Sequence, residues 1–124
     1  MVSEGHKKFI KTKKTEYNNI GHILCPAFNN EKIYFNREGF NHLLWKGDSY
    51  RAVSEQQERL SLIPFAVSLL GMCGSYSTYR NSRTDENTAK FWAFDSMLGN
   101  KSVSVVVRQI NEGNKHFLSV FYKT

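Results

Sequence analysis

A long apolar hairpin near the C-terminus constrains the fold of this chain more than any other feature. The segment VVVRQINEGNKHFLSVFY contains two β-type runs joined by the turn residues Asn111-Glu112-Gly113. A type I turn followed by a left-handed glycine is a common three-residue connection. That loop places Arg108 directly opposite His116, whereas a two- or four-residue loop pairs Arg108 with Phe117 and puts His116 on the other face.

The three-residue loop separates apolar from polar side chains better, so we prefer it. One face of the hairpin is then a core surface, made of Val103, Val105, Val107, Phe117 and Phe121. Arg108 and His116 share the other face with Val106, Leu118 and Tyr122. In this register Ser119 falls on the apolar face unless a β-bulge intervenes.

Helical patterns precede the hairpin, and two further strands lead into it. Asn36 is placed to cap a first helix, and Ser54-Glu55-Gln56-Gln57 has the pattern of a capping box. Pro64 either kinks the second helix or begins a third. The runs IGHILCP and KIYF are β-type, and YSTYR and KFWAFDSML precede a tight turn at Gly99-Asn100. We predict an α+β domain whose N-terminal helices pack on a four-stranded antiparallel sheet.

The bulk properties indicate one domain with a basic N-terminal segment. The chain has 124 residues, and no apolar run approaches the roughly 20 residues of a membrane helix. The net charge is +6, of which residues 1–15 carry five lysines and one glutamate, or +4. We therefore expect a flexible basic arm over 1–15 and a single domain over 16–124. The N-terminus lacks an apolar signal segment and the two cysteines lack metal-ligand spacing, which predicts a cytoplasmic protein.

Arg108 and His116, as neighbours, resemble a phosphodiester-cleaving site. Cleavage of RNA through its own 2′-hydroxyl needs a base, an acid and a fixed cation near phosphorus. Histidine titrates near neutrality, and arginine binds phosphate through a planar fork. Few carboxylates follow Glu86, and the four histidines lack zinc-ligand spacing, so the sequence favours chemistry without a metal or another cofactor.

Three segments together resemble a known family: EKIYFNREGFNHLLWKG, EQQERLSLIPFA and VVVRQINEGNKHFLSVFY. Their order is similar to that in phage-associated nucleases of the barnase–EndoU–colicin–RelE-like superfamily, over roughly residues 20–122. The resemblance implies a metal-independent ribonuclease with a barnase- or RelE-like fold. It also implies catalytic roles for His116, Arg108, His42 and Ser119. A glutamate base has no clear counterpart, which moves the base role to His42.

Further residues are candidates for contact with RNA. We expect Lys46 and Lys115 to contact phosphate, Arg80 to reach substrate from the first strand of the sheet, and Tyr122 to stack on a base. Each also has an ordinary structural explanation, because lysines near turns are usually solvated and strand aromatics usually lie in the core.

These features lead to one expected function and one alternative. We expect a small endoribonuclease of toxin or effector type that cleaves RNA to a 2′,3′-cyclic phosphate. We expect it not to associate with a membrane. Such an enzyme implies an acidic antitoxin or immunity protein that covers its basic cleft. The alternative is a non-catalytic RNA-binding module, or an inactive relative of mobile-element origin, that uses the same sheet face and the basic arm.

Overall fold

The computed structural model describes residues 3–123, and its first element is the helix α1 (Glu4–Asn18). Ser3 caps this helix, since its side chain accepts a hydrogen bond of 3.1 Å from the amide of His6. Phe9 and Ile10 pack against the hydrophobic core, and Tyr17 lies inside it. The flexible arm predicted over 1–15 was therefore wrong for residues 4–15, because the apolar side chains between the lysines anchor this segment. Residues 1–2 lie outside the described residues.

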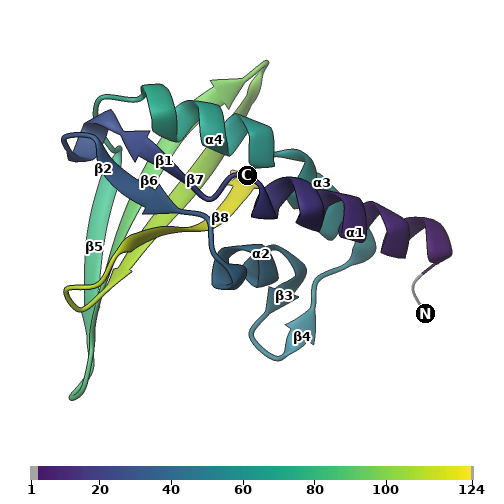
Figure 1. Ribbon diagram of the computed structural model, residues 1–124, viewed down its shortest axis with the longest axis horizontal. Coiled ribbons are helices and arrows are strands. Elements are labelled where there is room, and N and C mark those ends of the chain that lie inside the picture. Colours follow the sequence, from purple (N-terminus) through teal and green to yellow (C-terminus); the bar gives the residue numbers. More distant parts are fainter. Residues whose placement is uncertain (1–2, 124) are drawn as a thin grey trace.

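The main sheet of the fold has six strands in the order β1-β2-β8-β7-β6-β5 (Figure 1). Its strands are β1 (His22–Cys25), β2 (Glu31–Tyr34), β5 (Thr78–Arg83), β6 (Thr88–Leu98), β7 (Lys101–Ile110) and β8 (Lys115–Tyr122). All neighbours are antiparallel except β2 and β8. The α+β class is confirmed, but the predicted sheet of four strands was too small. Parallel pairing of Ile33 with Lys115 and of Tyr34 with His116 adds β2, and with it β1, to the predicted strands.

The remaining elements lie between β1 and β5. They are the 3-10 helix η1 (Pro26–Phe28), α2 (Arg37–Leu44), β3 (Trp45–Lys46), β4 (Ser49–Tyr50), α3 (Val53–Ser61) and α4 (Ile63–Met72). Asn36 caps α2 as predicted, accepting from the amide of Gly39 at 3.1 Å. The predicted capping box is wrong, because α3 begins at Val53 with Ala52 at its N-cap. Pro64 opens a separate helix, as expected of a residue without an amide donor. Among residues 3–123, no helix is long and apolar enough to cross a membrane.

The helix α2 packs directly on β8, past the point where β2 stops pairing with that strand. Gly39 makes this close approach possible, since a Cβ atom there would collide with the carbonyl oxygen of Phe117 and the hydroxyl of Tyr17. The same hydroxyl donates a hydrogen bond of 2.7 Å to the carbonyl of Asn36. Phe35 stacks on Phe117 with ring centroids 4.9 Å apart. These contacts fix the position of α2 beside the sheet.

The final hairpin has the predicted register at its turn and a different one beyond it. Arg108 pairs with His116, as expected, but the left-handed turn residue is Asn111 (φ 53°) rather than Gly113. A β-bulge then shifts the register, so that Val106 pairs with Ser119.

The bulge exchanges the faces of the C-terminal half of β8. Ser119 and Phe121 join the face of Arg108, whereas Val120 is fully buried and Tyr122 packs against the core. The predicted core position of Phe121 and the open-face position of Tyr122 were therefore wrong.

Candidate functional site

A cleft of about 750 Å³ lies where the sheet meets α2, β3 and α3. Strands β5 to β8 contribute one side of it, and α2, β3, Arg51 and α3 contribute the other. Of the residues predicted for the site, five line this cleft: His42, Lys46, Arg80, Arg108 and Ser119. Segments separated by up to 77 residues therefore meet in one site.

The lining of the cleft is strongly basic. Five cationic side chains contribute to it, and Glu55 is the one acidic residue among the described lining residues. With histidine neutral, the local balance is 5 − 1 = +4. The cations are Lys46, Arg51, Arg59, Arg80 and Arg108. Such a concentration of positive charge attracts anions, and guanidinium groups favour phosphate through paired hydrogen bonds.

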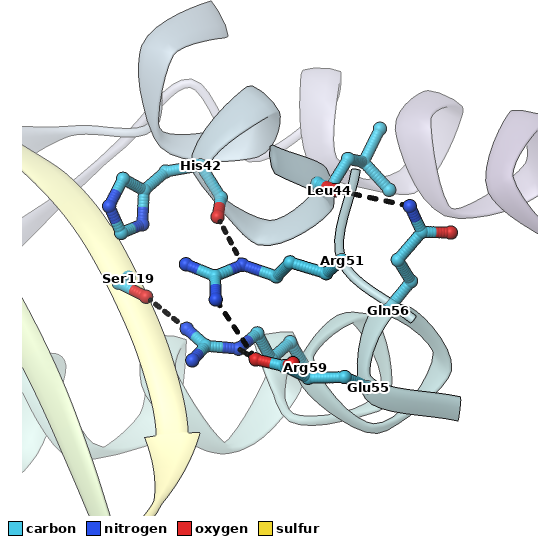
Figure 2. A network of polar contacts seen from close by, with 7 residues as sticks. All are labelled: His42, Leu44, Arg51, Glu55, Gln56, Arg59 and Ser119. Atoms are coloured by element: carbon cyan, nitrogen blue, oxygen red, sulfur yellow. Dashed lines mark hydrogen bonds and ion pairs between the residues drawn. The ribbon is translucent and has the colours of Figure 1, made fainter. Parts of the chain in front are cut away.

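Two of these cations, Arg51 and Arg59, are held by one carboxylate (Figure 2). Arg51 Nη1 and Arg59 Nε each donate a hydrogen bond of 2.9 Å to Oε2 of Glu55. Arg59 Nη1 also donates to the hydroxyl of Ser119 at 2.9 Å, and Arg51 Nε donates to the carbonyl of His42 at 3.0 Å. One carboxylate neutralises only one of the two guanidinium groups, so the cluster keeps a net positive charge.

The basic N-terminal helix α1 is connected to this cluster through Gln56 of α3. Gln56 donates from Nε2 to the carbonyl of Leu44 at 3.1 Å, which joins α3 to the end of α2 (Figure 2). Its Oε1 lies 2.6 Å from Nε2 of the buried His6 in α1. Because Gln56 follows Glu55 directly, α1 helps to fix the position of the carboxylate that holds both arginines.

His42 is the candidate acid–base group of the cleft. Its ring lies on the side of α2 that faces Ser119, and its Nδ1 atom is buried with no hydrogen-bond partner among the described residues (Figure 2). Burial, followed by the positive charges of Arg51, Arg59 and Arg108, lowers the pKa of His42 below its ordinary value. The imidazole is therefore neutral at pH 7, which is the form that accepts a proton.

Arg108 and His116 are in contact, but they have different positions relative to the cleft. Arg108 lines it, whereas His116 is only 7% exposed and is not among the lining residues. Arg108 Nε donates to Nε2 of His116 at 3.0 Å, and Arg108 Nη2 forms an ion pair with Glu38. Since arginine only donates, Nε2 must be unprotonated and Nδ1 carries the ring proton. Burial and the charge of Arg108 lower the pKa of His116, so this ring is a neutral acceptor that orients Arg108.

Two predicted substrate contacts lie elsewhere. Tyr122 is on the core face of the sheet because of the β-bulge, opposite Val103. Lys115 forms an ion pair of 2.8 Å with Glu31, and its ammonium lies 5.1 Å from the ring centroid of Trp92. The structure therefore brings neither residue into the cleft.

Three residues of the cluster were missed by the sequence analysis: Arg51, Glu55 and Arg59. Their spacing of four residues is a signal, since charged residues at i and i+4 lie on one side of a helix. That pattern usually marks an exposed helix surface. Here the side chains of Arg51 and Arg59 are only 6% and 14% exposed. Arg59 lies on α3, which packs against β8, and Arg51 lies just before this helix.

Among residues 3–123, no group of three or more His, Cys, Asp or Glu side chains is placed to hold a metal ion. Comparisons of the chain with protein-family models, with curated proteins and with solved structures found no match.

Proposed function

We propose that the cleft binds RNA and cleaves it without a metal ion, through attack of the 2′-hydroxyl on the adjacent phosphate. One observation carries this proposal: the ring of His42, whose Nδ1 atom has no hydrogen-bond partner among the described residues, lies in a cleft whose lining has a charge of +4. A neutral imidazole accepts the hydroxyl proton, and fixed cations stabilise the charge that develops on phosphorus. The proton acceptor and the cations that this reaction needs are thus candidates within one cleft.

Each step is assigned to a side chain of the cleft. His42 removes the proton of the 2′-hydroxyl, whose oxygen then bonds to phosphorus. Arg51 and Arg59 bind the non-bridging oxygens, and Ser119 keeps Arg59 in place. The bond from phosphorus to the 5′-oxygen breaks, and that oxygen takes a proton from Lys46 or from water. The products are a 2′,3′-cyclic phosphate and a free 5′-hydroxyl.

Arg108 contributes a further cation, which is positioned by a hydrogen bond to His116 and an ion pair with Glu38. In this proposal His116 is a positioning residue that acts through Arg108. Its replacement reduces cleavage less than replacement of His42, because the guanidinium stays in the cleft in a less ordered position.

A ribonuclease of this kind fits the toxin or effector type of the barnase–EndoU–colicin–RelE-like superfamily, acting in the cytoplasm. The charge of the cleft is complementary to an acidic antitoxin or immunity protein. The same surface that binds phosphate would then bind the carboxylates of this partner.

The alternative is an RNA-binding module without catalysis. One specific observation favours it: the contact between Arg108 and His116 leaves His42 as the one histidine lining the cleft within the described chain. A module of this kind binds RNA with the same cations but transfers no proton.

The test compares cleavage of labelled total RNA in excess EDTA by the wild type, His42→Asn and His22→Asn. His22 lies on β1, is exposed and does not line the cleft, so it is a matched control. We expect cyclic-phosphate ends with the wild type and the control. Rates should fall about 10²- to 10⁴-fold in His42→Asn, the usual contribution of a proton-transfer group.

Binding is measured separately, by fluorescence anisotropy at two salt concentrations. RNA affinity that falls with salt and survives His42→Asn, together with no cleavage by the wild type, would support the module instead. Equal cleavage by the wild type and His42→Asn would remove His42 from the mechanism.

A further inference from the structure

A row of four side chains crosses the sheet at one end of the cleft. Arg80 on β5 pairs with Phe91 on β6, Phe91 pairs with Arg108 on β7, and Arg108 pairs with His116 on β8. The guanidinium carbon of Arg80 lies 4.1 Å from the centroid of the Phe91 ring. A guanidinium group at this distance from an aromatic centroid forms a cation–π stack. Arg80 is exposed, so the outer face of this stack is open to the cleft.

The next row of the sheet consists of smaller side chains. Thr78 pairs with Ala93, Ala93 with Val106, and Val106 with Ser119. These residues line the cleft between the Arg80–Phe91 stack and Ser119, whose hydroxyl accepts from Arg59. The cleft therefore has an aromatic and cationic surface toward β5 and the Arg51–Arg59 cluster toward α3, with small side chains between them.

We propose that the Arg80–Phe91 stack is a nucleobase subsite, and that the cleft consequently takes unpaired RNA. This inference rests on the function proposed above and specifies its substrate. One base stacks on the Arg80–Phe91 pair, while an adjoining phosphate lies at the Arg51–Arg59 cluster. Arg108 lies beside Phe91 and reaches the phosphate that connects the two positions.

Stacking selects against a duplex for a physical reason. A base inside a helix has both faces covered by its neighbours, whereas a base in a loop or single strand can stack on an arginine or aromatic plane. The cleft volume of about 750 Å³ is typical of a site that encloses a small ligand. Double-stranded RNA is instead recognised over many base pairs by an extended surface.

The experiment measures the binding of a fluorescent, fully 2′-O-methylated oligonucleotide in two forms, single-stranded and annealed to its complement. The methyl group removes the attacking hydroxyl, so binding is observed without cleavage. We expect the single strand to bind at least about tenfold more tightly. A duplex that binds as tightly as the single strand would overturn the proposal.

Two variants localise the base. Phe91→Leu keeps an apolar side chain but removes the aromatic plane, and Arg80→Gln removes the exposed part of the stack. Each should weaken single-strand binding about 5- to 150-fold, which is the range for one lost stacked base. Arg83→Gln is the matched control, since Arg83 lies on the same strand, is exposed and does not line the cleft. It carries the same change of charge, and we expect an effect of about twofold or less.

An abasic oligonucleotide separates stacking from general electrostatics. It should bind the wild type and Phe91→Leu with equal affinity, because it has no base to lose. If Phe91→Leu weakens both oligonucleotides alike, or weakens neither, the base does not lie on this stack. Urea unfolding of Phe91→Leu and Arg80→Gln checks that both variants are folded, and Arg80→Gln carries the test if Phe91→Leu is not. Absence of binding to any RNA would instead refute the proposed function itself.

Discussion

The carboxylate of Glu55 offers the sharpest test of the cleft. The change Glu55→Gln keeps the size of the side chain and removes the charge that two guanidinium groups share. Both hydrogen bonds, at 2.9 Å, are to an ionised acceptor. The arginine side chains are 6% and 14% exposed, whereas that of Glu55 is 42% exposed. Removal of the charge therefore leaves two mostly buried cations without the carboxylate that they share.

The expected loss of unfolding free energy follows from these values. A hydrogen bond to a charged group contributes about 1.5–3 kcal/mol when buried, and an exposed ion pair about 0.2–1 kcal/mol. Because the carboxylate is partly solvated, we expect a total loss of about 1–3 kcal/mol. With a urea m-value of roughly 2 kcal/mol/M, the midpoint of unfolding should fall by about 0.5–1.5 M.

The assay is urea unfolding followed by circular dichroism, with Glu58→Gln as control. Glu58 lies on the same helix and is exposed. Inorganic phosphate should recover part of the loss in Glu55→Gln, compared with sodium chloride at equal ionic strength, because an anion can replace the carboxylate between the arginines. Equal midpoints for the two variants, or no specific effect of phosphate, would refute this account of the cluster.

Two further predictions concern stability. Burial lowers the pKa of both His42 and His116, so each binds protons more weakly in the folded than in the unfolded chain. Their contribution to stability is complete above the unfolded pKa of about 6.5. It decreases as the pH falls below that value. Urea unfolding between pH 7.5 and 5.5 should show this decrease, with a smaller slope in His42→Asn, and an unchanged slope would contradict it. Gly39→Ala should cost at least about 2 kcal/mol in urea or thermal unfolding, because its Cβ atom would meet the backbone of Phe117; Gly71→Ala, where nothing lies within 4 Å, is the control and should not destabilise the fold.

Local patterns predicted much of the architecture. The α+β class followed from helical spacing before alternating strands, and the pairing of Arg108 with His116 followed from a short turn. The cap at Asn36 needed only its own side chain and the amide three residues later. Such features depend on residues close together in the sequence, so the local sequence pattern is enough to predict them.

Other features were missed because they depend on distant segments. The lysines of α1 suggested a solvated arm, whereas the contact of His6 with Gln56 spans 50 residues. The addition of β1 and β2 to the sheet depends on parallel pairing between segments about 80 residues apart. Neither contact has a signature in the local pattern.

The candidate site is divided in the same way. The sequence alone contained the residue types that suit phosphate chemistry, and four of the residues it proposed, His42, Lys46, Arg80 and Arg108, line one cleft. Only long-range packing brings His116 into contact with Arg108 outside the cleft lining and turns Ser119 toward Arg59. The physical reason is that a single bulged residue reverses the faces of a strand, and that burial of a charge depends on which helix packs over it.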